Sequence, residues 1–316
     1  MAGVVVAKPG MLTTVQDRGR WGLQGSGVPV AGPMDPVSHR VANRLLGNQE
    51  DAAMLEVTLI GPELVFEESA VVAVCGAEFA LRVDGAAAPM WGPIEVRAGA
   101  RLTFGPRVRG ARAYCAIAGG VASEPVFGSR ATSLVARMGP FGGRALAAGD
   151  RLPLAPDRPR TIEDLPETTM KGRVTALVPL PQGGARLRVM WGPQEHLFTE
   201  VARDTLTSGR YVVTPQSNRM GYRLDGPRLA HRGSADILSD ATPHGTLQVP
   251  GSGQPILLMA DRQTAGGYPK IATVITADLA LAGQLAPGDW VAFVPCDRRE
   301  ALAALRDQEA LVSGAR

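Results

Sequence analysis

The sequence predicts a mainly β protein with a few short helices, organised as two β-rich units. The chain has 316 residues, of which 45% are hydrophobic and 20% charged, so it can bury a large core. Its 38 glycines and 25 prolines are too many for a helix-dominated protein, because both residue types break helices. A single core seldom grows past roughly 250 to 300 residues, so the length indicates two units.

Short β-rich runs recur along the chain, and glycine or proline borders most of them. They are residues 4–7, 71–75, 79–83, 101–104, 111–117, 186–190, 211–214, 256–259, 273–275 and 290–294. This pattern predicts short strands joined by turns.

Three helices interrupt the β pattern. The first has Asp35 as its N-cap, Pro36 at its first position and Gly47 just beyond its end. Its apolar side chains recur every four residues, at Val37, Val41 and Leu45. Two further helices are predicted over residues 195–203 and 300–311.

A weak internal repeat supports the division into two units. Leu146-Ala-Ala-Gly-Asp150 and Leu285-Ala-Pro-Gly-Asp289 each read as a turn that enters a terminal strand, although Gly-Asp turns are common in any protein. Between them lies a proline-rich stretch without periodicity. We therefore predict an N-terminal unit over 1–155, a linker over 156–172 and a C-terminal unit with a terminal helix over 173–316.

Charge and cysteine usage exclude several classes of protein. The net charge of +3 comes from arginine, since only three of the 33 basic residues are lysines. Nucleic-acid binding is not expected, because aromatic residues are only 5% and no recognition motif accompanies the arginines. Cys75, Cys115 and Cys296 are widely spaced in apolar runs, which predicts neither a disulfide framework nor a metal site and favours the cytoplasm. The longest apolar stretch, residues 70–77, is too short to span a membrane.

The common catalytic signatures are missing. The sequence contains no GxxxxGK[ST], GxGxxG, HExxH, CxxC or GxSxG motif, so a standard P-loop nucleotide site is excluded. Among the histidines, His39 is expected to be solvated on the first helix, and His196 and His231 to be surface or boundary residues.

Four polar, glycine-rich segments are the candidate functional regions: residues 14–35, 128–132, 217–223 and 248–269. Such loops let backbone N–H groups approach an anion, while Arg, Gln, Ser and Thr provide directional hydrogen bonds. The alternative is structural, because glycine permits positive φ at barrel corners and polar groups satisfy buried turns. Asp17 and Arg20 fit either a structural ion pair or a catalytic role. The structural alternative is favoured for 128–132 alone, and a functional role for 248–269.

Six motifs occur in a recognisable order: TVQDRGRWG (14–22), GPMD (32–35), AN and GN (42–48), GSRAT (128–132), SNRMGYRL (217–224) and QTAGGYP (263–269). Together they resemble the biotin-dependent carboxyltransferase family. That family includes the C subunit of bacterial 5-oxoprolinase, allophanate hydrolase subunit 2 and the matching region of urea carboxylase. The resemblance covers residues 13–295, nearly the whole chain.

The resemblance implies two cyclophilin-like β-barrel units and an enzyme built from several subunits. The implied partners are a homologous protein of the 5-oxoprolinase B-subunit or allophanate hydrolase subunit 1 type, and a protein of the 5-oxoprolinase A-subunit type or a biotin carboxylase and carrier. The implied chemistry is carboxyl transfer between carboxybiotin and an amide-type nitrogen, or ATP-dependent opening of 5-oxoproline to glutamate. Biotin would belong to a partner, since Lys171 lacks the alanine and methionine that flank a biotin-carrying lysine. ATP would also be bound by a partner, since this chain has no P-loop motif.

Amide chemistry needs donors for a developing oxyanion, a cation that orients a carboxylate and a group that moves the nitrogen proton. On the resembling motifs, the N–H groups of Gly266 and Gly267, with Gln263 and Thr264, are assigned to the oxyanion.

The remaining roles fall on neighbouring motif residues. Arg219 is assigned to carboxylate orientation, with Asp261 supporting it, and Tyr268 or Tyr222 to proton transfer. Three further residues are expected to line the substrate site: Ser217, Asn218 and Gln248.

Two alternatives from other classes stay open. One branch of the family antagonises an inhibitor of a sporulation kinase, so a non-catalytic regulatory binding protein is the second hypothesis. A lectin-like or other small-molecule-binding barrel is the third. An enzyme subunit needs its polar loops to converge on one pocket, whereas a regulator needs an exposed apolar patch.

Overall fold

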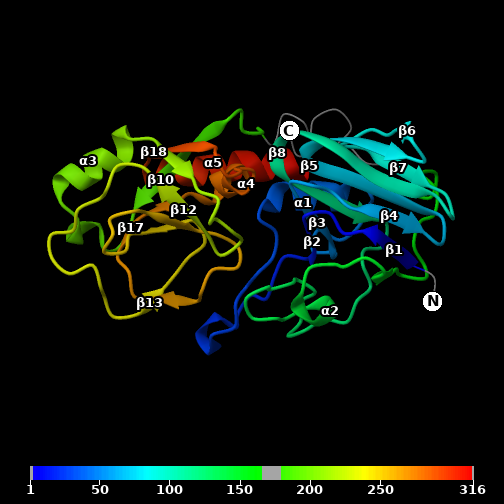
Figure 1. Ribbon diagram of the computed structural model, residues 1–316, viewed down its shortest axis with the longest axis horizontal. Coiled ribbons are helices and arrows are strands. Elements are labelled where there is room, and N and C mark those ends of the chain that lie inside the picture. Colours follow the sequence, from blue (N-terminus) through cyan, green and yellow to red (C-terminus); the bar gives the residue numbers. More distant parts are fainter. Residues whose placement is uncertain (1–2, 166–178, 315–316) are drawn as a thin grey trace. The chain divides into compact units, whose positions relative to one another are not determined.

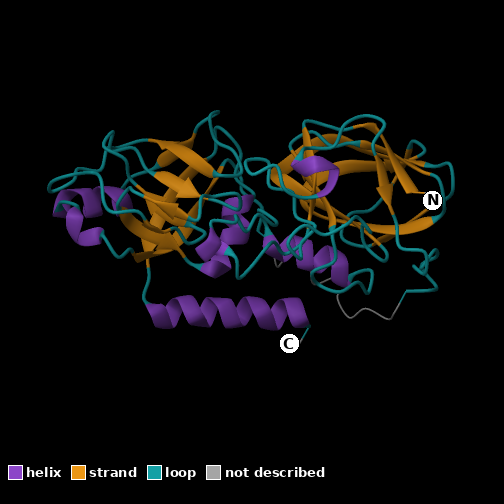
Figure 2. Cartoon of the chain, turned by 90° about the horizontal axis from the view of Figure 1, so that it is seen from below, coloured by secondary structure: helices purple, strands orange, loops and turns teal. Residues whose placement is uncertain are grey.

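The computed structural model describes residues 3–165 and 179–314, and it divides into two compact units. Unit 1 comprises Met1–Arg20, Ala31–Leu180 and Val312–Arg316, and unit 2 comprises Trp21–Val30 and Pro181–Leu311. Strands form the body of each unit (Figures 1 and 2). The predicted linker, 156–172, and Lys171 fall partly or wholly outside the described residues, so the predicted boundary stays a prediction.

Unit 1 is built on a nine-stranded curled sheet. Its strands are β1 (Gly3–Lys8), β2 (Leu12–Gln16), β3 (Met54–Thr58), β4 (Glu63–Phe66), β5 (Ala70–Val83), β6 (Ala86–Ala87), β7 (Pro93–Val96), β8 (Arg101–Ile117) and β9 (Arg151–Pro153). The main path runs β2-β3-β8-β4-β1-β9, and β5 pairs with β6, β7 and β8. The core side chains of Val4, Phe66, Val72, Cys115 and Leu152 are all fully buried on this sheet.

The two long strands, β5 and β8, each join two runs that the sequence separates. The prediction ended strands at Cys75 and Phe104 because glycine follows each run closely. In the structure the register between β5 and β8 shifts between Gly76 and Leu81, so the pair bends without ending. An extra residue in one strand adds local twist and curvature, which is how a sheet curls around its core.

Helix α1 (Pro36–Arg44) confirms the first predicted helix and its N-cap. Asp35 Oδ1 accepts hydrogen bonds from the backbone N–H groups of Val37 (3.1 Å) and Ser38 (2.9 Å). Its Oδ2 accepts from Ser38 Oγ at 2.6 Å. Gly47 follows the helix with φ of 67°, in the left-handed region that favours glycine.

His39 is not solvated, so that prediction is wrong. It lies on α1 fully buried, and its Nε2 is 3.2 Å from the carbonyl oxygen of Gln16. Burial lowers the pKa of His39 to about 4, because the charged form would lose its hydration. Spacing along a helix cannot tell a solvated histidine from a buried one, whereas packing of α1 on the sheet decides it.

Unit 2 contains a closed barrel with the strand order β10-β17-β14-β15-β12-β11-β18. These strands are β10 (Gly184–Trp191), β11 (Tyr211–Val213), β12 (Gly221–Asp225), β14 (Thr246–Gln248), β15 (Ile256–Leu258), β17 (Lys270–Val274) and β18 (Trp290–Pro295). A separate two-stranded sheet pairs β13 (Asp240–Ala241) with β16 (Ala265–Gly266). The predicted mainly β class with barrel-type units is thereby confirmed.

Strand β12 begins inside the segment 217–223, which the sequence presents as a polar loop, and ends two residues beyond it. Its side chains alternate, with Tyr222 and Leu224 buried and Arg223 exposed, which is the period of a half-buried strand. The run is only five residues long and follows the turn residues of the SNRMG segment, so the alternation is hard to see in the sequence.

Of the two other predicted helices, the structure confirms the C-terminal one and divides the other into two segments. Helix α5 (Arg298–Ser313) confirms the C-terminal helix. The helix predicted over 195–203 is instead a short 3-10 turn, η3 (Glu195–Leu197), followed by α3 (Glu200–Ser208). Thr199 separates them because its side chain accepts from the N–H of Ala202 and caps α3. The short helical segments are η1 (Gln24–Ser26), α2 (Pro140–Gly143), η4 (Thr276–Asp278) and α4 (Leu279–Gly283).

The repeated Gly-Asp sequence forms the same turn in both units. The carboxylate of Asp150 accepts from Ala147 N at 2.7 Å, and that of Asp289 accepts from Ala286 N at 2.8 Å. Gly149 and Gly288 both have positive φ, 88° and 94°. Each turn leads directly into a strand, β9 or β18, as the repeat predicts.

No helix within residues 3–165 and 179–314 is long and apolar enough to cross a membrane.

The cap of α1 yields a stability prediction. Replacing Asp35 with Ala removes the acceptor for two helix N–H groups, so the free energy of unfolding should fall by about 1–2 kcal/mol. Urea denaturation measures the loss. Asp35→Asn keeps an acceptor at this position and should lose less, and equal losses for both variants would contradict the capping role.

The buried His39 yields a pH prediction. Unfolded His39 takes up a proton near pH 6.5, whereas folded His39 does so only near pH 4, so protonation favours the unfolded chain between these values. His39 should therefore make the fold lose up to about 3 kcal/mol as the pH falls from 7 to 4. Urea denaturation at several pH values should give a shallower pH dependence for His39→Gln, and unchanged dependence would show that His39 is not responsible.

Candidate functional site

Four predicted site residues lie together in unit 2, around the carboxamide of Gln248. This side chain is 1% exposed. Its Oε1 accepts from Gln263 Nε2 at 3.0 Å, and its Nε2 donates to the carbonyl oxygen of Tyr268 at 3.3 Å. Gln263 and Gly266 are only half-buried. The arrangement holds the Gln263 carboxamide in a defined position while part of it stays reachable from solvent.

Gly266 is required by the close approach of these two carboxamides. A Cβ added at Gly266 would lie 2.7 Å from Gln248 Nε2 and 3.1 Å from Gln263 Nε2. Any larger residue would push both amide groups from their positions. In this motif glycine therefore makes room for side chains, whereas the sequence suggests a role for its N–H group, which stays a prediction.

The rest of the QTAGGYP segment is anchored through its backbone to residues 237–242. The N–H of Thr242 donates to Thr264 O (3.1 Å), and the N–H of Ile237 donates to Gly267 O (2.8 Å). The hydroxyl of Thr242 donates to the carbonyl oxygen of Gln263. These bonds shape the loop that presents the predicted oxyanion donors.

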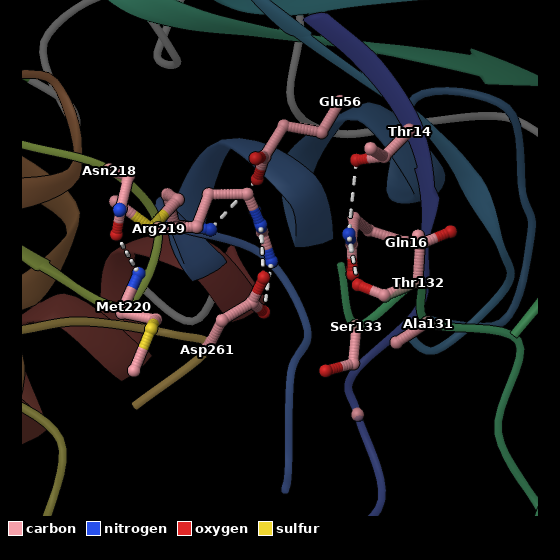
Figure 3. Close-up of polar contacts among 12 residues, drawn as sticks. Thr14, Gln16, Glu56, Ala131, Thr132, Ser133, Asn218, Arg219, Met220 and Asp261 are labelled. Atoms are coloured by element: carbon pink, nitrogen blue, oxygen red, sulfur yellow. Dashed lines mark hydrogen bonds and ion pairs between the residues drawn. The ribbon is translucent and has the colours of Figure 1, made fainter. Parts of the chain in front are cut away.

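Arg219 and Asp261 form a buried, bidentate ion pair (Figure 3). Arg219 Nε donates to Asp261 Oδ2 at 3.1 Å, and Nη2 donates to Oδ1 at 3.0 Å. The two side chains are only 3% and 1% exposed. Asp261 thus holds the edge of the guanidinium formed by Nε and Nη2, and its expected supporting role in a substrate site stays a prediction.

Ser217 and Asn218 shape the turn that precedes β12. Ser217 Oγ accepts from the N–H of Arg223 at 3.0 Å. Asn218 Oδ1 accepts from the N–H of Met220 at 2.8 Å (Figure 3). The Asn218 N–H donates to Gly221 O at 3.2 Å. These contacts give both residues a structural function, and their predicted contact with substrate stays a prediction.

The two candidate tyrosines differ in accessibility. Tyr222 is 1% exposed on β12, opposite Leu257 of β15. Tyr268 is 40% exposed beside the Gln248 cluster. A group that exchanges protons with a ligand must be reachable, so the geometry favours Tyr268 for proton transfer.

The sequence analysis assigns no role to two residues next to the ion pair, Arg262 and His244. Arg262 donates from Nε to Thr242 O at 2.8 Å, and burial lowers its pKa to about 10. Burial, with the nearby charges of Arg262 and Arg219, lowers the pKa of His244 to about 3. The Nε2 atom of His244 is buried and has no hydrogen-bond partner among the described residues. Sequence gives no signal for this environment, because it arises from burial.

Lys270, which directly follows the fourth segment, also escapes the sequence analysis. Its side chain is 2% exposed, and its Nζ lies 2.8 Å from Asp240 Oδ2. Asp240 lies opposite Gly266 in the β13–β16 pair. A lysine directly after QTAGGYP is the one available sequence signal.

The first two polar segments meet within unit 1. Gln16 Nε2 donates to Thr14 Oγ1 and to Thr132 O, both at 3.0 Å (Figure 3). Asp17 accepts from Ser129 Oγ at 2.6 Å, and Arg20 donates to Val126 O at 2.9 Å. Both charged side chains thus anchor the 126–132 loop, which favours the structural alternative for GSRAT.

The GPMD motif is held by a buried network that the sequence analysis misses. Tyr114 Oη donates to Glu56 Oε2 at 2.7 Å and accepts from the N–H of Asp35 at 2.7 Å. Glu56 also accepts from the N–H of Met34 at 2.8 Å. Burial, with the charge of Glu56, raises the pKa of the Tyr114 phenol well above its usual range. The network positions Asp35 to cap α1.

The Arg219–Asp261 pair yields a stability prediction. Asp261→Asn removes the charged carboxylate that binds two nitrogen atoms of a buried guanidinium, so the free energy of unfolding should fall by roughly 3–5 kcal/mol. Denaturant unfolding measures the loss. Arg144 and Asp150 form an ion pair in which the Arg144 side chain is 49% exposed. Asp150→Asn serves as the matched control, with an expected loss of about 1–2 kcal/mol because it weakens both this pair and the turn. A smaller loss for Asp261→Asn than for the control would contradict the importance of the buried pair.

Comparison with known proteins agrees with the resemblance drawn from the motifs. The family model described as carboxyltransferase domain, subdomain A and B, matches residues 26–295. The chain is 38% identical to the C subunit of 5-oxoprolinase from Escherichia coli K12, over 96% of this chain and 94% of that protein. It is 32% identical to urea amidolyase of Saccharomyces cerevisiae, over 92% of this chain but 16% of that protein.

A solved structure agrees as well. The crystal structure of K. lactis urea amidolyase matches the whole of this chain and 20% of that one, with a TM-score of 0.91 and 32% identity. The family model, the relatives and the shared fold lead to one conclusion: the chain belongs to the carboxyltransferase-domain family, and it is homologous to the C subunit of 5-oxoprolinase and to part of the urea amidolyases.

Proposed function

We propose that this chain is one component of a 5-oxoprolinase-type complex, which opens the amide C–N bond of 5-oxoproline to give glutamate at the expense of ATP. The observation that carries the proposal is the match to the C subunit of 5-oxoprolinase over 94% of that protein's length, against 16% for the yeast urea amidolyase. Carboxyl transfer to a urea-type nitrogen is the related reaction within the same family.

The Gln248 cluster supplies the chemistry that this reaction needs. Gln248 holds the carboxamide of Gln263, so its N–H group is already oriented when the oxygen of an amide gains charge. Gly267 and Thr264 lie on the same anchored loop. Tyr268, exposed beside them, would move the proton of the amide nitrogen, with the buried Tyr222 as the second candidate.

Partners complete the reaction in this proposal. A homologous protein of the 5-oxoprolinase B-subunit type and a protein of the A-subunit type would supply the remaining surfaces and the ATP site. Where a partner carries biotin, its carboxylated form supplies the carboxyl group, and Gln263 would bind the ureido oxygen. The thiols of Cys75 and Cys115 are free and buried, which fits a cytoplasmic location.

A regulatory binding role is the second candidate, and one surface favours it. In unit 1 a shallow groove is lined by Phe79, Leu81, Met90, Trp91 and Val108, and Val108 is 70% exposed. Exposed apolar surface of this kind can bind a protein partner. The enzyme proposal is preferred because the polar residues of the fourth segment converge around Gln248.

The proposal is tested on the complex that co-purifies with the tagged full chain. The assay measures ATP hydrolysis that depends on 5-oxoproline, with urea as the second substrate. Gln263→Ala removes a pre-oriented donor and should lower kcat on the order of a hundredfold.

The matched control is Gln308→Ala, because Gln308 Nε2 also donates one hydrogen bond, from helix α5 to Ala277 O at 2.9 Å. This variant should keep full turnover. Full turnover by Gln263→Ala in an intact complex would refute the site. A complex that hydrolyses ATP in response to neither substrate would refute the enzyme proposal in favour of the regulatory one.

A further inference from the structure

The ammonium group of Lys270 is buried with a single partner. Its side chain is 2% exposed, and Asp240 Oδ2, at 2.8 Å, is its one hydrogen-bond acceptor among the described residues. A lysine ammonium has three N–H donors. Burying it without acceptors for the other two is costly, so this group is suited to receive further oxygen atoms from a ligand.

Lys270 lies within the Gln248 cluster. In the pairing of β14 with β17, Lys270 is the partner of Gln248, just beyond a register shift that leaves Ile271 without a counterpart. Asp240 is directly opposite Gly266, whose missing Cβ makes room for the carboxamides of Gln248 and Gln263. The cation and the predicted amide-binding groups therefore share one location.

The two members of this ion pair differ sharply in burial. The Asp240 side chain is 51% exposed, whereas that of Lys270 is 2% exposed. The hydrogen bond and charge of Lys270 hold the pKa of Asp240 below its usual value, so Asp240 is a carboxylate at neutral pH. Asp240 Oδ1 also accepts from the N–H of Ala241 at 2.8 Å, and Oδ2 accepts from Gln194 Nε2 at 3.4 Å. Asp240 is nevertheless half exposed, whereas Lys270 is buried, so a carboxylate that arrives from solvent can compete with Asp240 for the ammonium group and keep the buried charge neutralised.

A ligand carboxylate cannot replace Asp261 in the same way at the Nε and Nη2 atoms of Arg219. Asp261 is 1% exposed and binds two guanidinium nitrogen atoms, so its replacement would require opening the barrel interior. The carboxylate that a ligand can replace is therefore Asp240, the partner of Lys270, and not Asp261, the partner of Arg219.

We propose that Lys270 binds the carboxylate of a small acidic amide substrate, and that Asp240 occupies this position until the substrate displaces it. The inference rests on the proposed function and deepens it, because it restricts the substrate to amides that carry a carboxylate. It moves the role of carboxylate orientation from Arg219 to Lys270.

The test is a calorimetric titration of the full chain with 5-oxoproline and with 2-pyrrolidinone, the same ring without the carboxylate. The wild-type chain should bind 5-oxoproline at least tenfold more tightly than 2-pyrrolidinone. Asp240→Asn removes the competing carboxylate, so it should bind 5-oxoproline several-fold more tightly. A purely structural ion pair predicts the opposite or no change, because Asp240→Asn could then only loosen the loop.

Variants of the lysine complete the test. Lys270→Gln should bind both compounds with equal, weak affinity, and Lys270→Arg should recover part of the preference for 5-oxoproline. Thermal unfolding of each variant checks the barrel. If Lys270→Gln does not fold, Asp240→Asn alone decides the matter, since unchanged or weaker binding of 5-oxoproline by folded Asp240→Asn overturns the inference.

The outcomes separate this inference from the proposed function. A wild-type chain that shows no preference for 5-oxoproline overturns the inference, even if the complex hydrolyses ATP with urea. Binding that depends on Lys270, in a chain whose complex turns over neither substrate, supports the inference as a carboxylate-binding site and refutes the catalytic proposal.

Discussion

The buried ion pair of Arg219 and Asp261 is the interaction on which the candidate site depends. It joins the turn before β12 to the segment after β15, and the N–H of Asp261 also donates to the carbonyl oxygen of Arg219 at 2.8 Å. Arg262 and Gln263 follow Asp261 directly, so their backbone positions are set by this pair. A charge pair this deeply buried is stable only if both partners stay in place, and it therefore acts as a rigid reference for the loop beyond it.

From this reference a series of hydrogen bonds orders the loop. The carbonyl oxygen of Thr242 accepts a hydrogen bond from Arg262 Nε, and the Thr242 hydroxyl donates to the carbonyl oxygen of Gln263. Gln248 then orients the side chain of Gln263, and the absence of a side chain at Gly266 allows the two carboxamides to meet. Gln248 is 1% exposed, whereas Gln263 is half-buried, so the series ends at a donor that solvent can reach. Donors held in place by buried structure are what a preorganised binding site requires.

The two units share one turn, although the sheet of unit 2 is a closed barrel and that of unit 1 is not. Each contains the same Gly-Asp turn, in which the aspartate accepts from the backbone three residues earlier and the strand follows at once. In unit 2 the sheet closes on itself, with β10 and β18 parallel to each other. In unit 1 long bent strands curl the sheet, and a helix capped by Asp35 packs on it. The motifs of the family fall mostly on turns and loop anchors, which explains why each motif alone looks structural.

The sequence by itself determined the mainly β class, the Asp35 cap, the C-terminal helix and the paired Gly-Asp turns, because each depends on local geometry that a few neighbouring residues specify. It also located the family and the QTAGGYP segment. Only the tertiary structure decided that β5 and β8 are continuous, that His39 is buried, and that Lys270 stands opposite Gln248 with an exposed partner. Burial and cross-strand register depend on residues far apart in the chain, and no pattern within a short window contains them.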